Sequence, residues 1–228
     1  MERNLVIFDC DGVLVDSERH SAEALREMAA QEGLPLSPAA ALAFIRGRKV
    51  ATWVSELEER LGRNLPADFI PSFRRRAAER FDTGLEPVPR VRELLDGLRL
   101  PYCTASSAPR EKILHTLGLT GLLHLFEGRI YSAYEVGAWK PDPALFLHAA
   151  REMGAPAHRC IVVEDSLVGV QAGVAAGMTV FGYAPSENGT SSALTEAGAI
   201  TFESMDDLPE LLASLPRTRR VSTSVSVR

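Results

Sequence analysis

Residues 5–17 read Leu5-Val6-Ile7-Phe8-Asp9-Cys10-Asp11-Gly12-Val13-Leu14-Val15-Asp16-Ser17, an apolar run that ends in two carboxylates one residue apart. The run predicts a buried parallel strand, and α/β sheets place their sites at the carboxyl ends of such strands. Residues i and i+2 of an extended segment point the same way, so Asp9 and Asp11 should face one pocket. A calcium-binding loop or a polar turn is disfavoured, because the residues after Gly12 are apolar.

The composition and charge of the chain exclude several classes of protein. The chain has 228 residues, is 46% hydrophobic and carries a formal net charge of -5. The charge gives no basic footprint for nucleic acid, and no apolar run is long enough to span a membrane. We therefore expect no nucleic-acid partner and no membrane partner, and we expect a cytoplasmic protein. Cys10, Cys103 and Cys160 lie in or beside apolar strand-like runs, which predicts buried thiols and not a disulfide framework or a metal site.

The order of strand and helix patterns predicts an α/β fold with a doubly wound, Rossmann-like parallel sheet. Helical segments alternate with predicted strands at 101–105, 129–131, 160–164, 179–183 and 199–202. Before residue 101 the pattern is helical, with Ser17 as a plausible N-cap of the first helix and further helices at 38–46, 50–61 and 67–82.

A helical stretch of this length is too long for an ordinary crossover after the first strand, so it predicts an inserted domain. We expect residues 1–15 and 85–215 to form the core domain and residues 16–84 to form a helical cap domain. The cap could close over the site like a lid. Residues 216–228 contain no acidic residue and few core-forming side chains, which predicts a disordered tail.

Polar residues follow three of the later strands. Ser106 and Ser107 come between a strand and a helix, where hydroxyls and free N–H groups can bind an anion, although a serine there is often only an N-cap. Lys140 lies in the string Trp139-Lys140-Pro141-Asp142-Pro143, where the alternative is a solvated charge.

Glu164 and Asp165 end an apolar strand, and carboxylates at such a place are costly unless they meet a cation. A hard divalent ion would satisfy Asp9, Asp165 and Glu164 together, and oxygen ligands with retained waters favour Mg²⁺ over Ca²⁺. Gly169, Gly173 and Gly177 follow at intervals of four, which predicts close packing of a helix on the sheet.

The pattern DxDG(V/T)(L/V)xDS at residues 9–17 resembles the first signature of the haloacid-dehalogenase-like phosphatases and phosphomutases. Ser106, Lys140 and the pair Glu164-Asp165 match the other three signatures in order. The resemblance implies that Asp9 attacks phosphorus to form an aspartyl-phosphate, and that Asp11 protonates the leaving oxygen and then activates water. It also implies that Ser106, Ser107 and Lys140 bind the phosphoryl group, and that Asp9, Asp11, Glu164 and Asp165 form the Mg²⁺ site.

The resemblance implies a small phosphorylated metabolite as substrate, and we expect a monomer or a weak homodimer. The lid residues Gly47 and Lys49 and the stretch around Lys140 look closest to the 6-phosphogluconate phosphatase branch, so a sugar or sugar-acid phosphate is expected. Arg46 or Lys49 would then bind an anionic group remote from the phosphate, unless both belong to a solvated basic face.

Three other functions compete with this one. The first is a phosphomutase of the β-phosphoglucomutase kind, whose lid histidine has its position at Ser21 here, with His20 beside it. The second is a non-catalytic phosphate-binding protein. The third, a haloacid dehalogenase, is disfavoured by Asp11, because cleavage of a carbon–halogen bond needs no acid.

Overall fold

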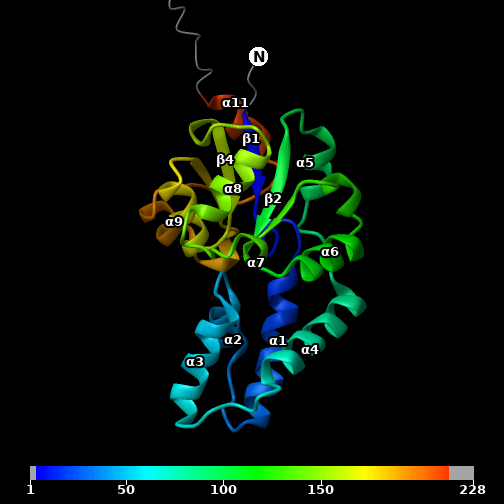
Figure 1. Cartoon of the computed structure of the whole chain (residues 1–228), viewed down its shortest axis with the longest axis vertical. Helices are drawn as coiled ribbons and strands as arrows, with labels where there is room; N and C mark the ends of the chain where they lie inside the picture. The colour runs from blue at the N-terminus through cyan, green and yellow to red at the C-terminus, as the bar shows by residue number, and fades with distance from the viewer. Residues whose placement is uncertain (1–3, 216–228) are drawn as a thin grey trace, which may run out of the picture.

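A six-stranded parallel sheet forms one end of the molecule and four helices form the other (Figure 1). The strands are β1 (Leu5–Phe8), β2 (Tyr102–Ser106), β3 (Ile130–Ser132), β4 (Cys160–Glu164), β5 (Thr179–Tyr183) and β6 (Ile200–Phe202). In this computed structural model, which describes residues 4–215, they run in the order β3-β2-β1-β4-β5-β6. The predicted tail at 216–228 lies outside the described residues.

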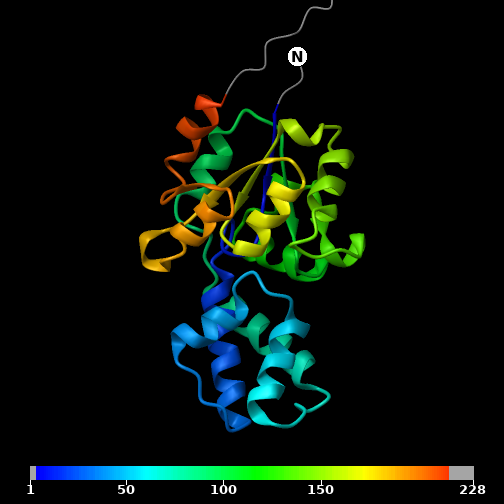
Figure 2. The same cartoon turned by 90° about the vertical axis from the view of Figure 1, so that its left-hand side faces the viewer.

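The apolar residues of β1 explain why helices cover both faces of the sheet, since successive side chains of a strand point to opposite faces. Val6 and Phe8 join a core cluster with residues of α5 (Val91–Gly97) and α6 (Arg110–Leu119). Leu5 and Ile7 join a second cluster with residues of α8 (Ala144–Glu152) and α9 (Leu167–Ala175). Figure 2 shows the sheet and the helices that cover it after a turn of 90°. The remaining helices are α7 (Ala133–Val136), α10 (Ser191–Glu196), α11 (Leu208–Ser214), η1 (Leu123–Phe126), η2 (Ala157–Arg159) and η3 (Ser186–Asn188).

The predicted fold class is confirmed: all five strand pairings are parallel and helices cover the sheet on both faces. The predicted strands lie within about a residue of the observed ones, because continuous apolar runs bounded by turns are typical of buried parallel strands. The three cysteines are buried and free, as predicted.

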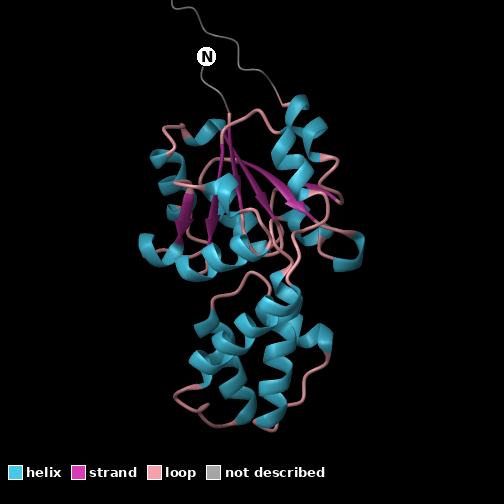
Figure 3. Ribbon diagram, turned by 90° about the vertical axis from the view of Figure 1, so that its right-hand side faces the viewer, coloured by secondary structure: helices cyan, strands magenta, loops and turns pink. Residues whose placement is uncertain are grey.

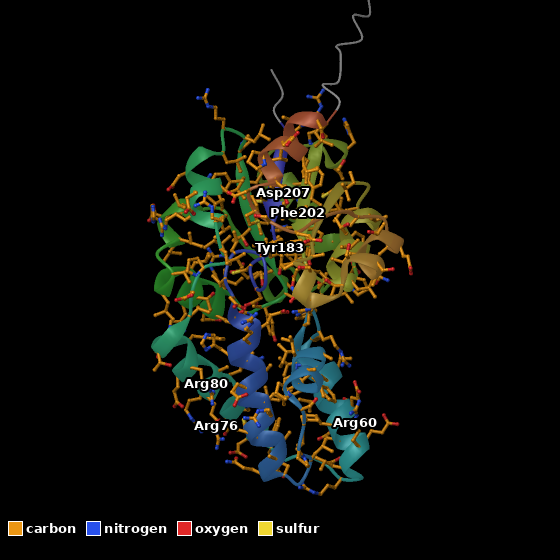
Figure 4. All side chains as sticks on the ribbon, turned by 180° about the vertical axis from the view of Figure 1, so that it is seen from behind. Arg60, Arg76, Arg80, Tyr183, Phe202 and Asp207 are labelled. Atoms are coloured by element: carbon orange, nitrogen blue, oxygen red, sulfur yellow. The ribbon has the colours of Figure 1, made fainter. Side chains whose placement is uncertain are left out.

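The second body consists of α1 (Ser17–Gln31), α2 (Pro38–Ile45), α3 (Val50–Leu61) and α4 (Phe69–Gly84). Its helices bury aromatic side chains against one another, and the rings of Trp53 and Phe73 meet edge to face with centroids 5.0 Å apart. Figure 4 shows that three of its arginines, Arg60, Arg76 and Arg80, lie along α3 and α4 away from the sheet.

The chain enters and leaves this second body through two segments that lie side by side. Val15 and Pro87 form an antiparallel bridge, and the amide of Asp16 donates to the carbonyl of Glu86 at 3.0 Å. These two adjacent segments of the chain therefore connect the four-helix body to the body that contains the sheet.

The start of α1 differs from the prediction that Ser17 is its N-cap. Asp16 takes the capping position and Ser17 is the first helical residue. The hydroxyl of Ser17 donates to a side-chain oxygen of Asp11 and not to the helix backbone. The predicted helix at 67–82 is likewise shifted, because α4 begins at Phe69 and continues to Gly84.

The predicted close packing of three glycines holds for two of them. A Cβ at Gly169 would overlap the carboxylate of Glu164, and one at Gly173 would lie 2.7 Å from Val180. Gly177 lies beyond α9 with a φ of +71°, where it terminates the helix and faces open space.

We predict that Gly169→Ala destabilises the protein, because the added methyl group must displace a buried carboxylate. Overpacking of this kind typically costs about 1–3 kcal/mol. Gly118→Ala on α6 is the matched control, since its nearest neighbour would be Leu123 at 4.0 Å and alanine favours the helix by up to about 1 kcal/mol. The measurement is urea unfolding of both variants, and a Gly169→Ala protein as stable as the wild type would contradict the prediction.

Candidate active site

The carboxyl ends of the strands face the second body (Figure 3). Polar side chains predicted from the sequence line a cavity at this place. Asp9 directly follows β1, Ser106 is the last residue of β2, and Asp165 directly follows β4. Lys140 comes from the loop between α7 and α8. Three strand ends and one loop therefore converge on one place.

Lys140 lies between two carboxylates. Its ammonium is 2.5 Å from Asp9 and 2.5 Å from Glu164, and its side chain is 3% exposed. Burial favours the neutral amine, but the two carboxylates outweigh it and raise the pKa of Lys140. Lys140 is thus a fixed cation at the carboxyl end of β1.

Asp9, Glu164 and Asp165 form a group that could hold a metal ion. One oxygen of each lies within 4.8 Å of the others, and all three residues are buried. Burial raises the pKa of Asp9 to about 7, with Lys140 opposing the rise and Glu164 adding to it. Burial also raises the pKa of Asp165, and the neighbouring carboxylates add to that rise. A bound cation would offset the cost of burying the charged forms of Asp9 and Asp165.

The three members of this group differ in how many contacts they already make. One oxygen of Glu164 accepts from the backbone amides of Asp165 and Ser166 and from the Ser166 hydroxyl, and the other accepts from Lys140. Its place at the N-terminal end of α9 explains those amide donors. Asp9 and Asp165 therefore have the more available oxygens.

Asp11, which the sequence places with the metal ligands, is not one of the three carboxylates of this group. The same oxygen of Asp11 accepts from the Ser17 hydroxyl and, at 2.8 Å, from the ammonium of Lys112. Burial would raise the pKa of Asp11, but Lys112 and Ser17 outweigh burial and lower it. The two carboxylates of the first strand end thus have opposite electrostatic environments.

Ser106 and Ser107 both line the same cavity as these groups. Ser106 is 1% exposed, and its hydroxyl accepts from the amide of Ala108 at 3.1 Å. Ser107 is half-buried. The two hydroxyls therefore sit at the end of β2, beside the end of β1 with which it pairs.

A cavity of about 400 Å³ separates the sheet from the four helices. The sheet side contributes charged and hydroxyl groups, and the helical side contributes an aromatic wall with a cationic rim. The first set is Asp9, Asp11, Ser106, Ser107, Lys112, Lys140, Glu164 and Asp165, and the second is Arg48, Lys49, Trp53, Phe73, Arg74 and Phe81.

Lys49 and Arg46, the two cations predicted to bind substrate from the lid, have different surroundings. Lys49 lines the cavity, with its ammonium 3.9 Å from the ring centroid of Trp139. Arg46 does not line it, because its guanidinium pairs with Glu18 at 2.9 Å and donates to Asn188 at 3.3 Å. Arg46 therefore joins the helical body to the core.

Lys112 and Ser17 are two cavity-lining residues that motif reasoning did not identify as part of the site. Lys112 lies in the first turn of α6, where a cation opposes the helix dipole. This unfavourable cation at the start of a helix is the feature of the sequence that could have pointed to Lys112. Ser17 could have been found because it ends the first signature, although a serine at the start of a helical pattern also predicts a cap.

Known proteins resemble this chain over most of its length. Residues 4–177 match the haloacid dehalogenase-like hydrolase family. The 6-phosphogluconate phosphatase of Escherichia coli (strain K12) is 34% identical over 209 residues, which cover 90% of this chain and 93% of that protein.

Two solved structures are similar over most of their length. A haloacid dehalogenase-like protein of unknown function from Agrobacterium tumefaciens has a TM-score of 0.83 at 32% identity and covers 92% of this chain and 98% of its own. A putative β-phosphoglucomutase from Thermotoga maritima has a TM-score of 0.75 at 28% identity and covers 95% of this chain and 100% of its own. No helix in the described part of the chain could span a membrane. The chain belongs to the haloacid dehalogenase-like hydrolases.

Proposed function

We propose that this protein is a Mg²⁺-dependent phosphatase of a small phosphorylated metabolite. The observation that carries the proposal is the position of Asp9, which lies 2.5 Å from the buried Lys140 at the sheet side of the cavity. A carboxylate beside a fixed cation can attack phosphorus while the cation neutralises the phosphoryl charge.

The donor chemistry of the site fits Mg²⁺. Around the ends of β1 and β4, the four carboxylates of Asp9, Asp11, Glu164 and Asp165 are accompanied by the two ammonium groups of Lys112 and Lys140. This excess of negative charge, made only of oxygen donors, suits a hard divalent cation. We propose Asp9 and Asp165 as the side-chain ligands, with Glu164 beside them. Bound there, the ion would supply electrostatic stabilisation of the phosphoryl oxygens.

The residues of the chain would act in two steps. Asp9 forms a bond to phosphorus as the bond to the ester oxygen breaks, and Asp11 gives that oxygen its proton. Asp11 then takes a proton from the water that attacks phosphorus, and Asp9 is released. Ser106, Ser107 and Lys140 would hold the phosphoryl group through both steps.

We also propose that residues 16–84 are a cap domain that closes the cavity. Contacts on two sides support this role. Asp82 of α4 lies 2.7 Å from His115 of α6, and Arg74 donates to the hydroxyl of Tyr134 at 3.0 Å. On the other side the loop at Gly47 lies against Ser166, so closely that a Cβ there would overlap the serine.

The phosphomutase alternative has less support from the residues that line the cavity. Ser21 lines it at the position of the mutase histidine. The ring of His20 turns instead to the carbonyl of Gly84 at 3.1 Å and packs edge to face against Phe81. Hydrolysis by a captured water is therefore the favoured reaction over transfer to a second hydroxyl.

We predict that Asp9→Asn lowers kcat by more than about 10³-fold, because the amide is a poor nucleophile. Excess EDTA should abolish turnover of the wild type, and added Mg²⁺ should restore it. Asp96→Asn on the exposed face of α5 is the matched control and should be as active as the wild type. The measurement is phosphate release, and an active Asp9→Asn protein would refute the nucleophile assignment.

We predict that the metal-free protein loses stability as the pH rises from 3.8 towards about 7. In this range the folded protein keeps protons on Asp9 and Asp165 that the unfolded chain has released, so ionisation favours unfolding. In EDTA at about pH 8, Asp165→Asn should therefore have the higher Tm, by about 2–4 °C per kcal/mol gained.

At about pH 5 the Tm values of the wild type and Asp165→Asn should be closer, because a larger share of the folded protein then has a protonated Asp165, which is uncharged like the amide. Mg²⁺ should raise the Tm of the wild type at about pH 8 and have little effect on the variant. Thermal unfolding at both pH values is the measurement. A variant less stable than the wild type under both metal-free conditions would contradict the electrostatic account.

We propose a sugar-acid phosphate as the substrate, supported by Lys49 at the cavity rim and by the 6-phosphogluconate phosphatase relative. A contact between Lys49 and a distal carboxylate is typically worth about 1.5–3 kcal/mol, or roughly ten- to a hundredfold in kcat/KM. We predict this preference for 6-phosphogluconate over glucose 6-phosphate, and its loss in Lys49→Ala.

Arg75→Ala is the control for this prediction, since Arg75 is an exposed cation of the same body and does not line the cavity. It should keep the preference of the wild type, and p-nitrophenyl phosphate should be hydrolysed by all three proteins at similar rates. Equal kcat/KM for the two sugars would refute the sugar-acid assignment. Interconversion of glucose 1- and 6-phosphates without phosphate release would favour the mutases.

A further inference from the structure

Lys112 places a second ammonium in the active site, where it contacts Asp11 as Lys140 contacts Asp9. It lies in the first turn of α6, and its Nζ is 2.8 Å from Oδ1 of Asp11. A cation in the first turn of a helix is disfavoured by the helix dipole. The carboxylate of Asp11 compensates for that cost, so this contact explains why a lysine is tolerated there.

The contacts of Asp11 distinguish its two oxygens. The Ser17 hydroxyl and the Lys112 ammonium both donate to Oδ1. Among the residues that the structure describes, none donates a hydrogen bond to Oδ2. Two donors from different elements fix the plane of the carboxylate, and Oδ2 is left as the oxygen available for proton transfer.

Lys112 is held in place from the other side as well. Its ammonium lies 5.6 Å from the ring centroid of Phe81, which belongs to α4 of the helical body. A contact with a carboxylate and one with an aromatic ring both limit the freedom of the long side chain. Lys112 therefore meets Asp11 from the core while contacting the body that covers the cavity.

We propose that Lys112 is a positioning residue, which holds Oδ1 of Asp11 so that Oδ2 carries out both proton transfers. This inference rests on the proposed phosphatase function. In the first step Oδ2 gives its proton to the ester oxygen as the bond from that oxygen to phosphorus breaks and Asp9 becomes phosphorylated. In the second step Oδ2 receives a proton from water as the water oxygen bonds to phosphorus and the bond to Asp9 breaks.

The test compares Lys112→Met and Lys112→Gln with Lys112→Arg, which keeps the charged donor. Arg110→Met is the matched control, because it removes a cation from the same helix at a residue that pairs with Glu135 and not with Asp11. Circular dichroism and Tm establish that each variant is folded, and either folded neutral variant suffices.

We expect the neutral variants to lower steady-state kcat by about ten- to a hundredfold, the usual effect of losing a charge-assisted hydrogen bond. The burst of p-nitrophenol from p-nitrophenyl phosphate should stay within about threefold of the wild type, because this leaving group needs little protonation. Lys112→Arg should recover most of kcat, and Arg110→Met should keep the wild-type value.

A double-mutant cycle then asks whether Lys112 acts through Asp11. Asp11→Asn alone should show a burst followed by slow turnover. In that background Lys112→Met should change kcat by less than about threefold, because coupled residues are not additive. Equal losses in both backgrounds, or full activity of folded Lys112→Met, would overturn the positioning role. A wild type that releases no phosphate from any ester would instead overturn the phosphatase proposal.

Discussion

The buried ammonium of Lys140 is the contact on which the arrangement of the active site depends. It joins a loop to the ends of β1 and β4 through Asp9 and Glu164, at 2.5 Å from each. Two buried carboxylates this close would repel each other without a cation between them. The first contact holds Asp9, the proposed nucleophile, beside a fixed cation. Glu164 in turn accepts from the backbone amides that begin α9.

The two carboxylates of the first signature occupy different electrostatic environments although one residue separates them. Asp9 lies in the group with Glu164 and Asp165, and burial raises its pKa to about 7. Lys112 and Ser17 outweigh burial at Asp11 and lower its pKa. A divalent cation would compensate the negative charge around Asp9, and Lys112 already compensates that of Asp11, so the proposed nucleophile and the proposed proton carrier can share one turn.

The helical body completes a site that the sheet alone leaves open. It supplies the aromatic wall of the cavity and the rim cation Lys49, while the sheet supplies the groups proposed for phosphoryl transfer. This division fits a family in which one core would serve many phosphate esters. Contacts such as Arg46 with Asn188 and Asp82 with His115 hold the two bodies together around the cavity.

The sequence by itself determined the parallel sheet, its strand positions and the convergence of Asp9, Ser106 and Asp165, because apolar runs followed by polar residues indicate buried strands and their carboxyl ends. Lys140 comes from a loop, and the family resemblance placed it with them. Only the tertiary structure decided which charges meet. Arg46 pairs with Glu18, the carboxylate of Asp11 turns to Lys112, and Ser17 serves Asp11 instead of capping α1. These contacts join residues whose spacing in the chain carries no periodic signal, so their directions depend on how the helical body sits against the sheet.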